Sequence, residues 1–221
     1  MNLINHTGIA LRGGLYVVTG EDFFAARSYR EVVSACIEGG AGIIQLREKN
    51  WPASRIFEVG REVREITHKS GVLLIINDRV DLALALEADG VHIGQEDIPL
   101  RAVRKLAGSK LIIGVSVGTP EQALEAERSG ADYIGVGPIF PTETKKDARF
   151  PRGLQILTQI RQAVSLPIYA IGGVKLHNVA SVIRAGADGV AVVSAVVGAA
   201  DITDAARNFV AEIDRAKTII H

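Results

Sequence analysis

Polar and charged side chains follow a short apolar run near residue 45 of this sequence, where a buried strand would end. The run Gly42–Leu46 is apolar apart from Gln45, and Arg47, Glu48 and Lys49 come directly after it. Side chains two positions apart point to the same side of an extended chain, so Gln45 and Arg47 share a side. Arginine binds anions through a forked pair of N–H donors, and lysine acts as a point charge. The segment predicts an anion clamp, and a solvated strand end is the alternative.

Two aspartates follow the next two apolar runs and could share one divalent cation. Asp78 comes soon after the run Val72–Ile76, and Asp97 comes soon after the run Gly90–Ile93. If these runs are neighbouring parallel strands, the segments that follow them lie side by side. Mg²⁺ is commonly bound by one or two carboxylates and by substrate phosphates, with water completing its octahedron. We therefore expect Asp78 and Asp97 to bind Mg²⁺, with Glu96 as a further candidate ligand.

A structural role for these aspartates is the alternative. A helix is expected to begin near Val80, and Asp78 could cap its N-terminus. Asp97 is a poorer cap, because Pro99 in the first turn of the next helix would make Ile98 the capping residue. The sequence leaves both roles open for Asp78.

Ser116 follows the apolar run Leu111–Val115, and its hydroxyl could bond to the ring of a ligand. No histidine or carboxylate lies near Ser116 in the sequence, so we do not expect it to be a nucleophile. His92 lies inside an apolar run and is expected to be a core histidine whose hydrogen bonds are satisfied.

The longest polar connection comes after the run Tyr133–Val136. Connections of this length in a compact domain are usually functional, and a lid is a reasonable hypothesis. Its hydroxyl and ammonium groups suit a phosphate, and a solvated charged loop is the alternative. The candidate residues in it are Thr142, Glu143, Thr144 and Lys145.

Glycine and serine follow the last two apolar runs. Gly172 and Gly173 come after the run Ile168–Ile171, and Val193 and Ser194 end the run that begins at Gly189. Glycine allows a phosphate to approach backbone amides closely. A short helix is expected over 195–199. Together these segments predict a site for a phosphate monoester.

The elements that must position these residues alternate along the chain. Short apolar runs rich in β-branched residues are typical of buried parallel strands. Amphipathic stretches such as Ser54–Ser70, Pro120–Ser129 and Leu154–Val164 lie between them, and Ile202–Lys217 closes the chain. Eight such runs, each followed by a helical stretch, predict a single (β/α)₈ TIM barrel over 15–217, preceded by an N-terminal extension over 1–14. The expected strands are Leu15–Thr19, Gly42–Leu46, Val72–Ile76, Gly90–Ile93, Leu111–Val115, Tyr133–Val136, Ile168–Ile171 and Gly189–Val193.

A weak internal repeat supports this organisation. The segments 38–43, 128–133 and 184–189 are similar, with glycine and alanine before a strand, and 87–91 is a shortened copy. Each predicts a helix that ends at a glycine, a sharp turn and a strand. These turns lie at the N-terminal ends of the strands, where barrels carry stability rather than catalysis.

Composition restricts the partners of the chain. The 221 residues include 25 Lys+Arg and 25 Asp+Glu, so the formal net charge is zero and gives no reason to expect nucleic acid or an anionic membrane surface. No apolar run approaches the ~20 residues that span a bilayer. The first fourteen residues lack the apolar core of a signal peptide, and the single cysteine, Cys36, excludes an internal disulfide. A cytoplasmic location is the default expectation, and a homo-oligomer is compatible with the sequence.

Seven motifs, taken in order along the chain, resemble the thiamine-phosphate synthase family. They are QLREK at 45–49, NDR at 77–79, HIGQED at 92–97, GVS at 114–116, GPIFPTETKKDA at 137–148, IGG at 171–173 and VS at 193–194. The resemblance covers the chain from about Leu15 to Ser194. Each motif alone is weak, but the ordered set is highly specific.

The resemblance implies a barrel enzyme that joins hydroxymethylpyrimidine diphosphate to a thiazole phosphate with Mg²⁺, releasing pyrophosphate through a dissociative transition state. Arg47, Lys49, Ser116 and Lys145 would be catalytic, and Asp78 and Asp97 would bind the metal. By matching position, the pyrimidine diphosphate would contact Gln45, Leu46, Arg47, Glu48, Lys49, Asn77, Ser116 and Lys145. The thiazole phosphate would contact Thr142, Glu143, Thr144, Gly173, Val193 and Ser194.

Gly118 departs from the family's pattern, because relatives often carry histidine there. In the related thiazole tautomerases that histidine is thought to be catalytic, so its absence argues against a tautomerase. A tautomerase-like isomerase and a non-catalytic barrel that binds phosphorylated ligands remain the alternatives. The sequence does not say whether the thiazole is carboxylated.

Overall fold

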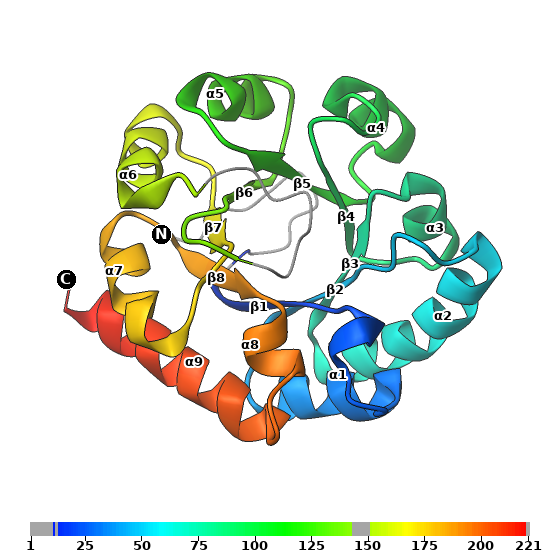
Figure 1. The fold of residues 1–221 in the computed structure, drawn as a ribbon. Helices are drawn as coiled ribbons and strands as arrows, with labels where there is room; N and C mark the ends of the chain where they lie inside the picture. Colours follow the sequence, from blue (N-terminus) through cyan, green and yellow to red (C-terminus); the bar gives the residue numbers. More distant parts are fainter. Residues whose placement is uncertain (1–10, 12, 143–150, 220–221) are drawn as a thin grey trace.

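Eight parallel strands close into a barrel in the computed structural model, which describes residues 11, 13–142 and 151–219. Each strand pairs with the next strand along the chain, and β8 pairs with β1 to complete the ring. Helices form an outer ring around the strands (Figure 1). The predicted TIM barrel is therefore confirmed. The strands are β1 (Gly14–Val18), β2 (Ile43–Leu46), β3 (Leu73–Asn77), β4 (Gly90–Ile93), β5 (Ile112–Val117), β6 (Tyr133–Val136), β7 (Ile168–Ile171) and β8 (Gly189–Val192).

The helices connect successive strands, and α9 packs against α7, α1 and β1 to cover the closure of the barrel. None of the helices in the described ranges is long and apolar enough to cross a membrane. The helical segments are η1 (Glu21–Phe23), α1 (Tyr29–Glu38), α2 (Ala53–Ser70), α3 (Val80–Ala85), α4 (Leu100–Ala107), α5 (Pro120–Arg128), α6 (Gly153–Ala163), η2 (Leu176–Asn178), α7 (Val179–Arg184), α8 (Ser194–Val197) and α9 (Ile202–Thr218).

Helix ends follow local sequence signals. Ser28 and Glu31 form a reciprocal capping box at the start of α1. Thr119 caps α5, which begins with Pro120, and the Asp201 carboxylate accepts from the N–H of Asp204 at the start of α9. These caps fix where α1, α5 and α9 begin.

Alternation along the strands divides the buried side chains into two layers. Most form the core between strands and helices, which includes Leu15, Val17, Ile44 and Leu46. A smaller cluster fills the barrel interior. It contains three tyrosines, Tyr16, Tyr133 and Tyr169, with ring centroids 5.3–6.0 Å apart. The interior is therefore a packed core that carries three hydroxyl groups.

The repeated turns form a repeated ionic contact at the N-terminal ends of the strands. Asp89 Oδ2 accepts from the N–H of Leu74 at 2.7 Å and from Arg64 at 2.8 Å. The same contact recurs at Asp132 with Ile113 and Arg104, and at Asp188 with Ile168 and Arg161. We call these three groups the Asp–Arg clamps. The structure thus explains the repeat as a folding device, as predicted.

The first copy of the repeat has Gly42 where the others have aspartate. Gly42 still donates its N–H to Leu15 O at 3.0 Å, as Asp89, Asp132 and Asp188 donate theirs to the preceding odd-numbered strand. The backbone geometry of the repeat is therefore preserved without the side chain.

Strands β3 and β5 extend beyond their predicted ends. Asn77 pairs with His92 in the ladder, and Ser116 and Val117 pair with Gly135 and Val136. The polar residues at these positions are part of the sheet, because strand pairing continues past the apolar runs. Ser116 is therefore held by the barrel rather than by a loop.

Candidate active site

The C-terminal ends of β2, β3 and β4 bring the predicted anion clamp and metal pair together. Lys49 Nζ lies 3.3 Å from Asp78 Oδ2, and the carboxyl groups of Asp78 and Asp97 lie within hydrogen-bond reach of each other. Burial and the neighbouring Asp97 raise the pKa of Asp78, although the ammonium of Lys49 opposes this shift. Two converging carboxylates therefore meet one ammonium at this end of the barrel.

Asp78 does not cap the helix that follows it. Helix α3 begins after Arg79, and no side chain caps it. Asp78 instead has φ 59°, in the left-handed region, and its N–H donates to His92 O at 2.8 Å. A non-glycine residue in this conformation is strained, and such strain is concentrated at functional sites. The capping alternative is therefore wrong for Asp78.

Asp97 closes the turn after β4. Its Oδ2 accepts from the N–H of Gly94 at 2.7 Å, which fixes the direction of the carboxylate. The capping residue of α4 is Pro99, not Ile98 as expected, and α4 begins at Leu100. Asp97 therefore does not cap α4, and its carboxylate remains beside that of Asp78.

The residues at the end of β2 and directly after it differ in their burial and contacts. Gln45 is buried in the barrel interior, whereas the Leu46 side chain packs into the outer core against the helices. Any contact from Leu46 to a ligand is therefore through its backbone. Arg47 donates its N–H to Thr19 Oγ1, and its guanidinium makes no ion pair with the described part of the chain.

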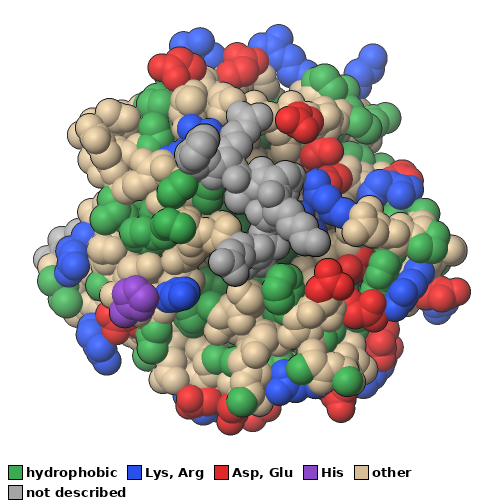
Figure 2. Space-filling model, in the orientation of Figure 1, with side chains coloured by type: hydrophobic (Ala, Val, Ile, Leu, Met, Phe, Trp, Pro, Cys, Tyr) green, Lys and Arg blue, Asp and Glu red, His purple; other side chains and the backbone are tan. Residues whose placement is uncertain are grey.

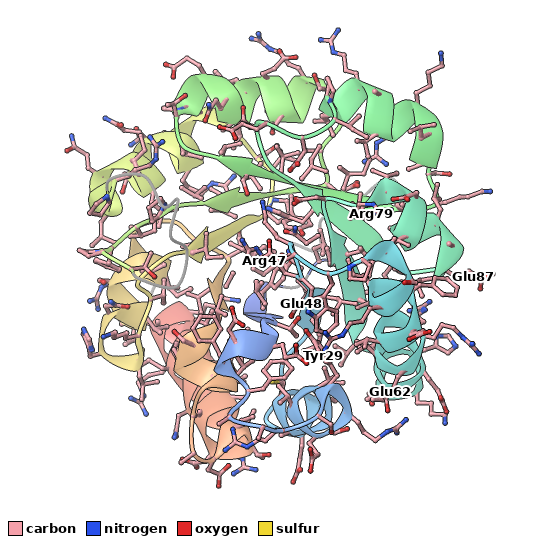
Figure 3. The ribbon with its side chains drawn as sticks, turned by 45° about the vertical axis from the view of Figure 1, so that its right-hand side comes forward. Tyr29, Arg47, Glu48, Glu62, Arg79 and Glu87 are labelled. Atoms are coloured by element: carbon pink, nitrogen blue, oxygen red, sulfur yellow. The ribbon has the colours of Figure 1, made fainter. Side chains whose placement is uncertain are left out.

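Glu48 turns away toward η1 and α1. Its carboxylate accepts from the hydroxyl of Tyr29 and from the N–H of Glu21, and Figure 3 shows Glu48 between Arg47 and Tyr29. Burial raises the pKa of Glu48 above its usual range. The Glu48 carboxylate therefore binds the segment after β2 to η1 and α1.

Ser116 and His92 are in contact across the sheet. Ser116 Oγ lies 2.8 Å from His92 Nε2, and His92 Nδ1 lies 3.0 Å from the hydroxyl of Tyr133. Both nitrogens of His92 are thus satisfied, as expected of a core histidine. The sequence distance between the two residues hid this contact. Strand register pairs His92 with Gly114, two residues before Ser116, so both positions lie on the same side of β5.

The residues of the predicted monophosphate site follow β6, β7 and β8, and the loops after β6 and β7 pack closely against each other. A Cβ at Gly172 would lie 2.5 Å from Pro138 Cβ, and a Cβ at Gly173 would lie 2.5 Å from Pro141 O. Only glycine fits where these loops pack. The expected short helix is α8, which begins at Ser194, earlier than predicted, directly after Val193.

Part of the predicted site cannot be placed. Thr142 is half-buried after β6, whereas Glu143, Thr144 and Lys145 lie outside the described residues. Charged side chains of both signs lie on the face of the barrel shown in Figure 2.

The profile of one protein family, described as thiamine monophosphate synthase, matches residues 15–196. The chain belongs to the thiamine monophosphate synthase family. A thiamine-phosphate synthase of Chloroflexus aurantiacus is 55% identical over 193 residues, which cover 87% of this chain and 89% of that protein. One from Moorella thermoacetica is 52% identical over 203 residues, covering 92% and 97%. A solved thiamine phosphate pyrophosphorylase from Pyrococcus furiosus has TM-score 0.86 and 41% identity, covering 97% of this chain and 99% of that one.

One basic residue that sequence analysis missed lies beside the departure from the thiamine monophosphate synthase pattern. Arg152, at the start of α6, donates from Nη1 to Gly118 O at 2.7 Å. A Cβ at Gly118 would lie 2.4 Å from Arg152 Cζ, so the guanidinium occupies the space beside the glycine. Its Nε is buried without a hydrogen-bond partner, alone in this among side-chain atoms of the described residues. The two positions are 34 residues apart, and no sequence pattern links them.

Proposed function

We propose that this chain joins hydroxymethylpyrimidine diphosphate to a thiazole phosphate, with or without a carboxyl group, forming thiamine phosphate and pyrophosphate. Membership of the thiamine monophosphate synthase family and relatives named thiamine-phosphate synthase at about half identity support this transferase activity. The observation that carries the proposal is the meeting of Asp78, Asp97 and Lys49 at one end of the barrel. Two carboxylates and an ammonium suit a metal-bound diphosphate rather than a single phosphate ester.

Mg²⁺ is the proposed metal, bound by Asp78 and Asp97. Among the described residues, no group of three or more His, Cys, Asp or Glu side chains could hold a metal ion. Two carboxylates fit a cation that takes its other ligands from substrate oxygens and water. When bound, the metal would neutralise charge on the leaving pyrophosphate.

The chain's own residues would bind and orient the diphosphate. Arg47 and Lys49 would bind its oxygens and neutralise the negative charge that grows as the carbon–oxygen bond breaks. Lys145 is proposed for the same task, although it lies outside the described residues. Gln45, Asn77 and Ser116 would hold the pyrimidine. Leu46 and Glu48 would also contact the pyrimidine diphosphate, and the contact from Leu46 would be through its backbone.

The thiazole phosphate would bind at the same end of the barrel, at the segments that follow β6, β7 and β8. Its proposed contacts are Gly173, Val193, Ser194 and Thr142, together with Glu143 and Thr144, which lie outside the described residues. The thiazole ring nitrogen would form a bond to the methylene carbon of the pyrimidine as the carbon–oxygen bond to pyrophosphate breaks, so no covalent enzyme intermediate is needed. Holding both rings in line would convert a bimolecular reaction into an effectively unimolecular one.

Pyrophosphate release tests this proposal directly. The purified chain is incubated with both heterocycles and Mg²⁺, and then with each heterocycle alone. Release that requires both substrates, together with thiamine phosphate formation, supports the synthase. Isomerisation of the thiazole phosphate without pyrophosphate release would identify a tautomerase, and tight binding without any product would identify a binding protein. Either of these two outcomes overturns the proposal.

The cellular setting is also a proposal. The chain is proposed to be a cytoplasmic enzyme that acts on small phosphorylated heterocycles, alone or as a homo-oligomer. Light scattering of the purified protein would determine the oligomeric state.

A further inference from the structure

A chain of side-chain hydrogen bonds crosses the barrel interior from β2 to β5. Gln45 Nε2 lies 2.6 Å from the hydroxyl of Tyr16, which lies 2.9 Å from the hydroxyl of Tyr133. His92 continues the chain, with Nδ1 3.0 Å from Tyr133 and Nε2 2.8 Å from Ser116 Oγ. The two ends, Gln45 and Ser116, belong to the proposed pyrimidine site, but the three residues between them do not.

Two glycines leave space for the side chains of this hydrogen-bond chain. A Cβ at Gly114 would lie 2.0 Å from Tyr133 Cζ, and a Cβ at Gly135 would lie 3.1 Å from His92 Cε1. The ring of Tyr133 can therefore pass directly over β5, where any larger residue at 114 would displace it. The route through the interior thus depends on backbone positions as well as on the polar side chains.

The bond between Gln45 and Tyr16 gives the chain a direction. An amide nitrogen can only donate, so the Tyr16 hydroxyl accepts from Gln45. Within the described part of the chain, the other partner of that hydroxyl is Tyr133, and the single proton of Tyr16 must point to it. The opposite assignment would bury a hydroxyl proton without an acceptor, which is disfavoured.

The direction continues to the active site. Tyr133 accepts from Tyr16 and therefore donates to His92 Nδ1, which leaves the proton of a neutral His92 on Nε2. His92 then donates to Ser116 Oγ, and the proton of Ser116 is available to a ligand. Burial raises the pKa of both Tyr16 and Tyr133, so both hydroxyls keep their protons near neutral pH.

We propose that Tyr16, Tyr133 and His92 are positioning residues that form a directed relay from Gln45 and hold Ser116 as a hydrogen-bond donor to the bound heterocycle. The ligand atom opposite Ser116 would then be an acceptor, such as a ring nitrogen of an aminopyrimidine. This identification of the ligand atom rests on the proposed function, but the state of His92 does not.

The state of the His92 ring tests the relay without any substrate. Nitrogen chemical shifts of the ¹⁵N-histidine-labelled full chain distinguish the two neutral forms of imidazole, and a His92→Gln variant identifies the His92 signals by their loss. We expect the proton on Nε2 in the wild type. A proton on Nδ1, or on both nitrogens near neutral pH, would reverse or break the relay and overturn the proposal.

Steady-state kinetics test what the relay does for substrate binding. Tyr133→Phe removes the middle hydroxyl but keeps the ring. We expect it to raise KM for the pyrimidine diphosphate about fivefold to tenfold, the effect of one hydrogen bond, and to leave KM for the thiazole phosphate unchanged.

Tyr169→Phe is the matched control. The Tyr169 ring centroid lies 5.6 Å from that of Tyr133, but its hydroxyl contacts the backbone of Gly13, outside the relay. We expect less than about a twofold change in either KM. Equal effects of the two substitutions would show that the hydroxyl of Tyr133 acts only through packing and would overturn the kinetic role. If Tyr133→Phe does not fold, the wild-type spectrum still tests the relay, because it shows which nitrogen of His92 carries the proton. An inactive wild type would refute the proposed function and leave that spectrum as the test.

Discussion

The guanidinium of Arg152 lies directly beside Gly118, so close that a side chain at position 118 would have to displace it. A Cβ on Gly118 would lie 2.4 Å from both Cζ and Nη2 of Arg152, and Nη1 donates a hydrogen bond to the Gly118 carbonyl. The resemblance to the thiamine-phosphate synthase family leads us to expect histidine at this position. The guanidinium of Arg152, from the start of α6, therefore fills the space that a side chain at position 118 would take. We expect the effects of substitutions at positions 118 and 152 on stability to depend on each other.

Gly118→Ala is predicted to displace the Arg152 side chain and to break its bond to the backbone. The loss should lower the free energy of unfolding by about 0.5–1.5 kcal/mol. Arg152→Ala should then cost less in the Gly118→Ala background than in the wild type, because the contact is already lost. Urea unfolding of the two single variants and the double variant measures this coupling.

Gly42→Ala is the control for this cycle. A Cβ at Gly42 would have its nearest neighbour at 4.0 Å, so no contact with Arg152 is lost. Its effect should add to that of Arg152→Ala. If the unfolding free energies of Gly118→Ala and Arg152→Ala were also additive, the Arg152 side chain would move aside without cost, and the prediction would be wrong.

Asp78→Asn and Asp97→Asn are predicted to impair turnover through the metal. Each removes one of two converging carboxylates, so kcat should fall on the order of 10²-fold or more. The Mg²⁺ concentration for half-maximal pyrophosphate release should rise in both variants. Asp81→Asn is the control, because Asp81 pairs with Arg79 at the surface, three residues from Asp78. Near-normal turnover without metal dependence in both variants would refute the assignment.

Glu48 should make the stability of the chain depend on pH. Burial raises its pKa in the folded chain, so protonation of Glu48 favours the folded state. This contribution is fully present below the unfolded-state pKa and is lost as pH rises through the raised value. The unfolding free energy of the wild type, relative to Glu48→Gln, should therefore be higher at about pH 4 than at about pH 7. Urea unfolding at both pH values gives the difference, and a difference independent of pH would contradict the prediction.

Asp132→Ala should destabilise the barrel strongly. The Asp132 side chain is 0% exposed and pairs with Arg104 at 2.6 Å. Its loss leaves the charge of Arg104 without its counter-ion and the N–H of Ile113 without its side-chain acceptor. Breaking a buried pair typically costs about 3–5 kcal/mol. Glu65→Ala, which breaks an exposed pair with Lys69, should change stability by less than about 0.5 kcal/mol. Similar costs in guanidinium unfolding would show that the clamp is not structural.

The sequence predicted the barrel because its signals are local. Each strand is an apolar run, and each turn at the N-terminal end of an even-numbered strand is marked by glycine and alanine. Those signals place Asp78 and Asp97 after neighbouring strands, so their proximity follows from topology alone. The capping residue of α4 was missed by one position, because proline itself occupies the cap.

The contacts of Ser116, His92 and Arg152 could not be predicted in the same way. They depend on which residues share a level in the barrel and on how far long side chains reach across it. The hydroxyl of Tyr133 meets His92 only because Gly114 lets its ring pass. Such contacts leave no periodic signal in one sequence.

The Asp–Arg clamps give the barrel a modular construction. Each clamp joins one helix, the strand after it and the next strand, as Arg64, Leu74 and Asp89 do on α2, β3 and the turn before β4. A cut between β4 and α4 would therefore leave every clamp whole within one fragment. Such a chain is suited to growth by duplication of quarter-barrels, and its two halves are suited to reassembly after separate synthesis.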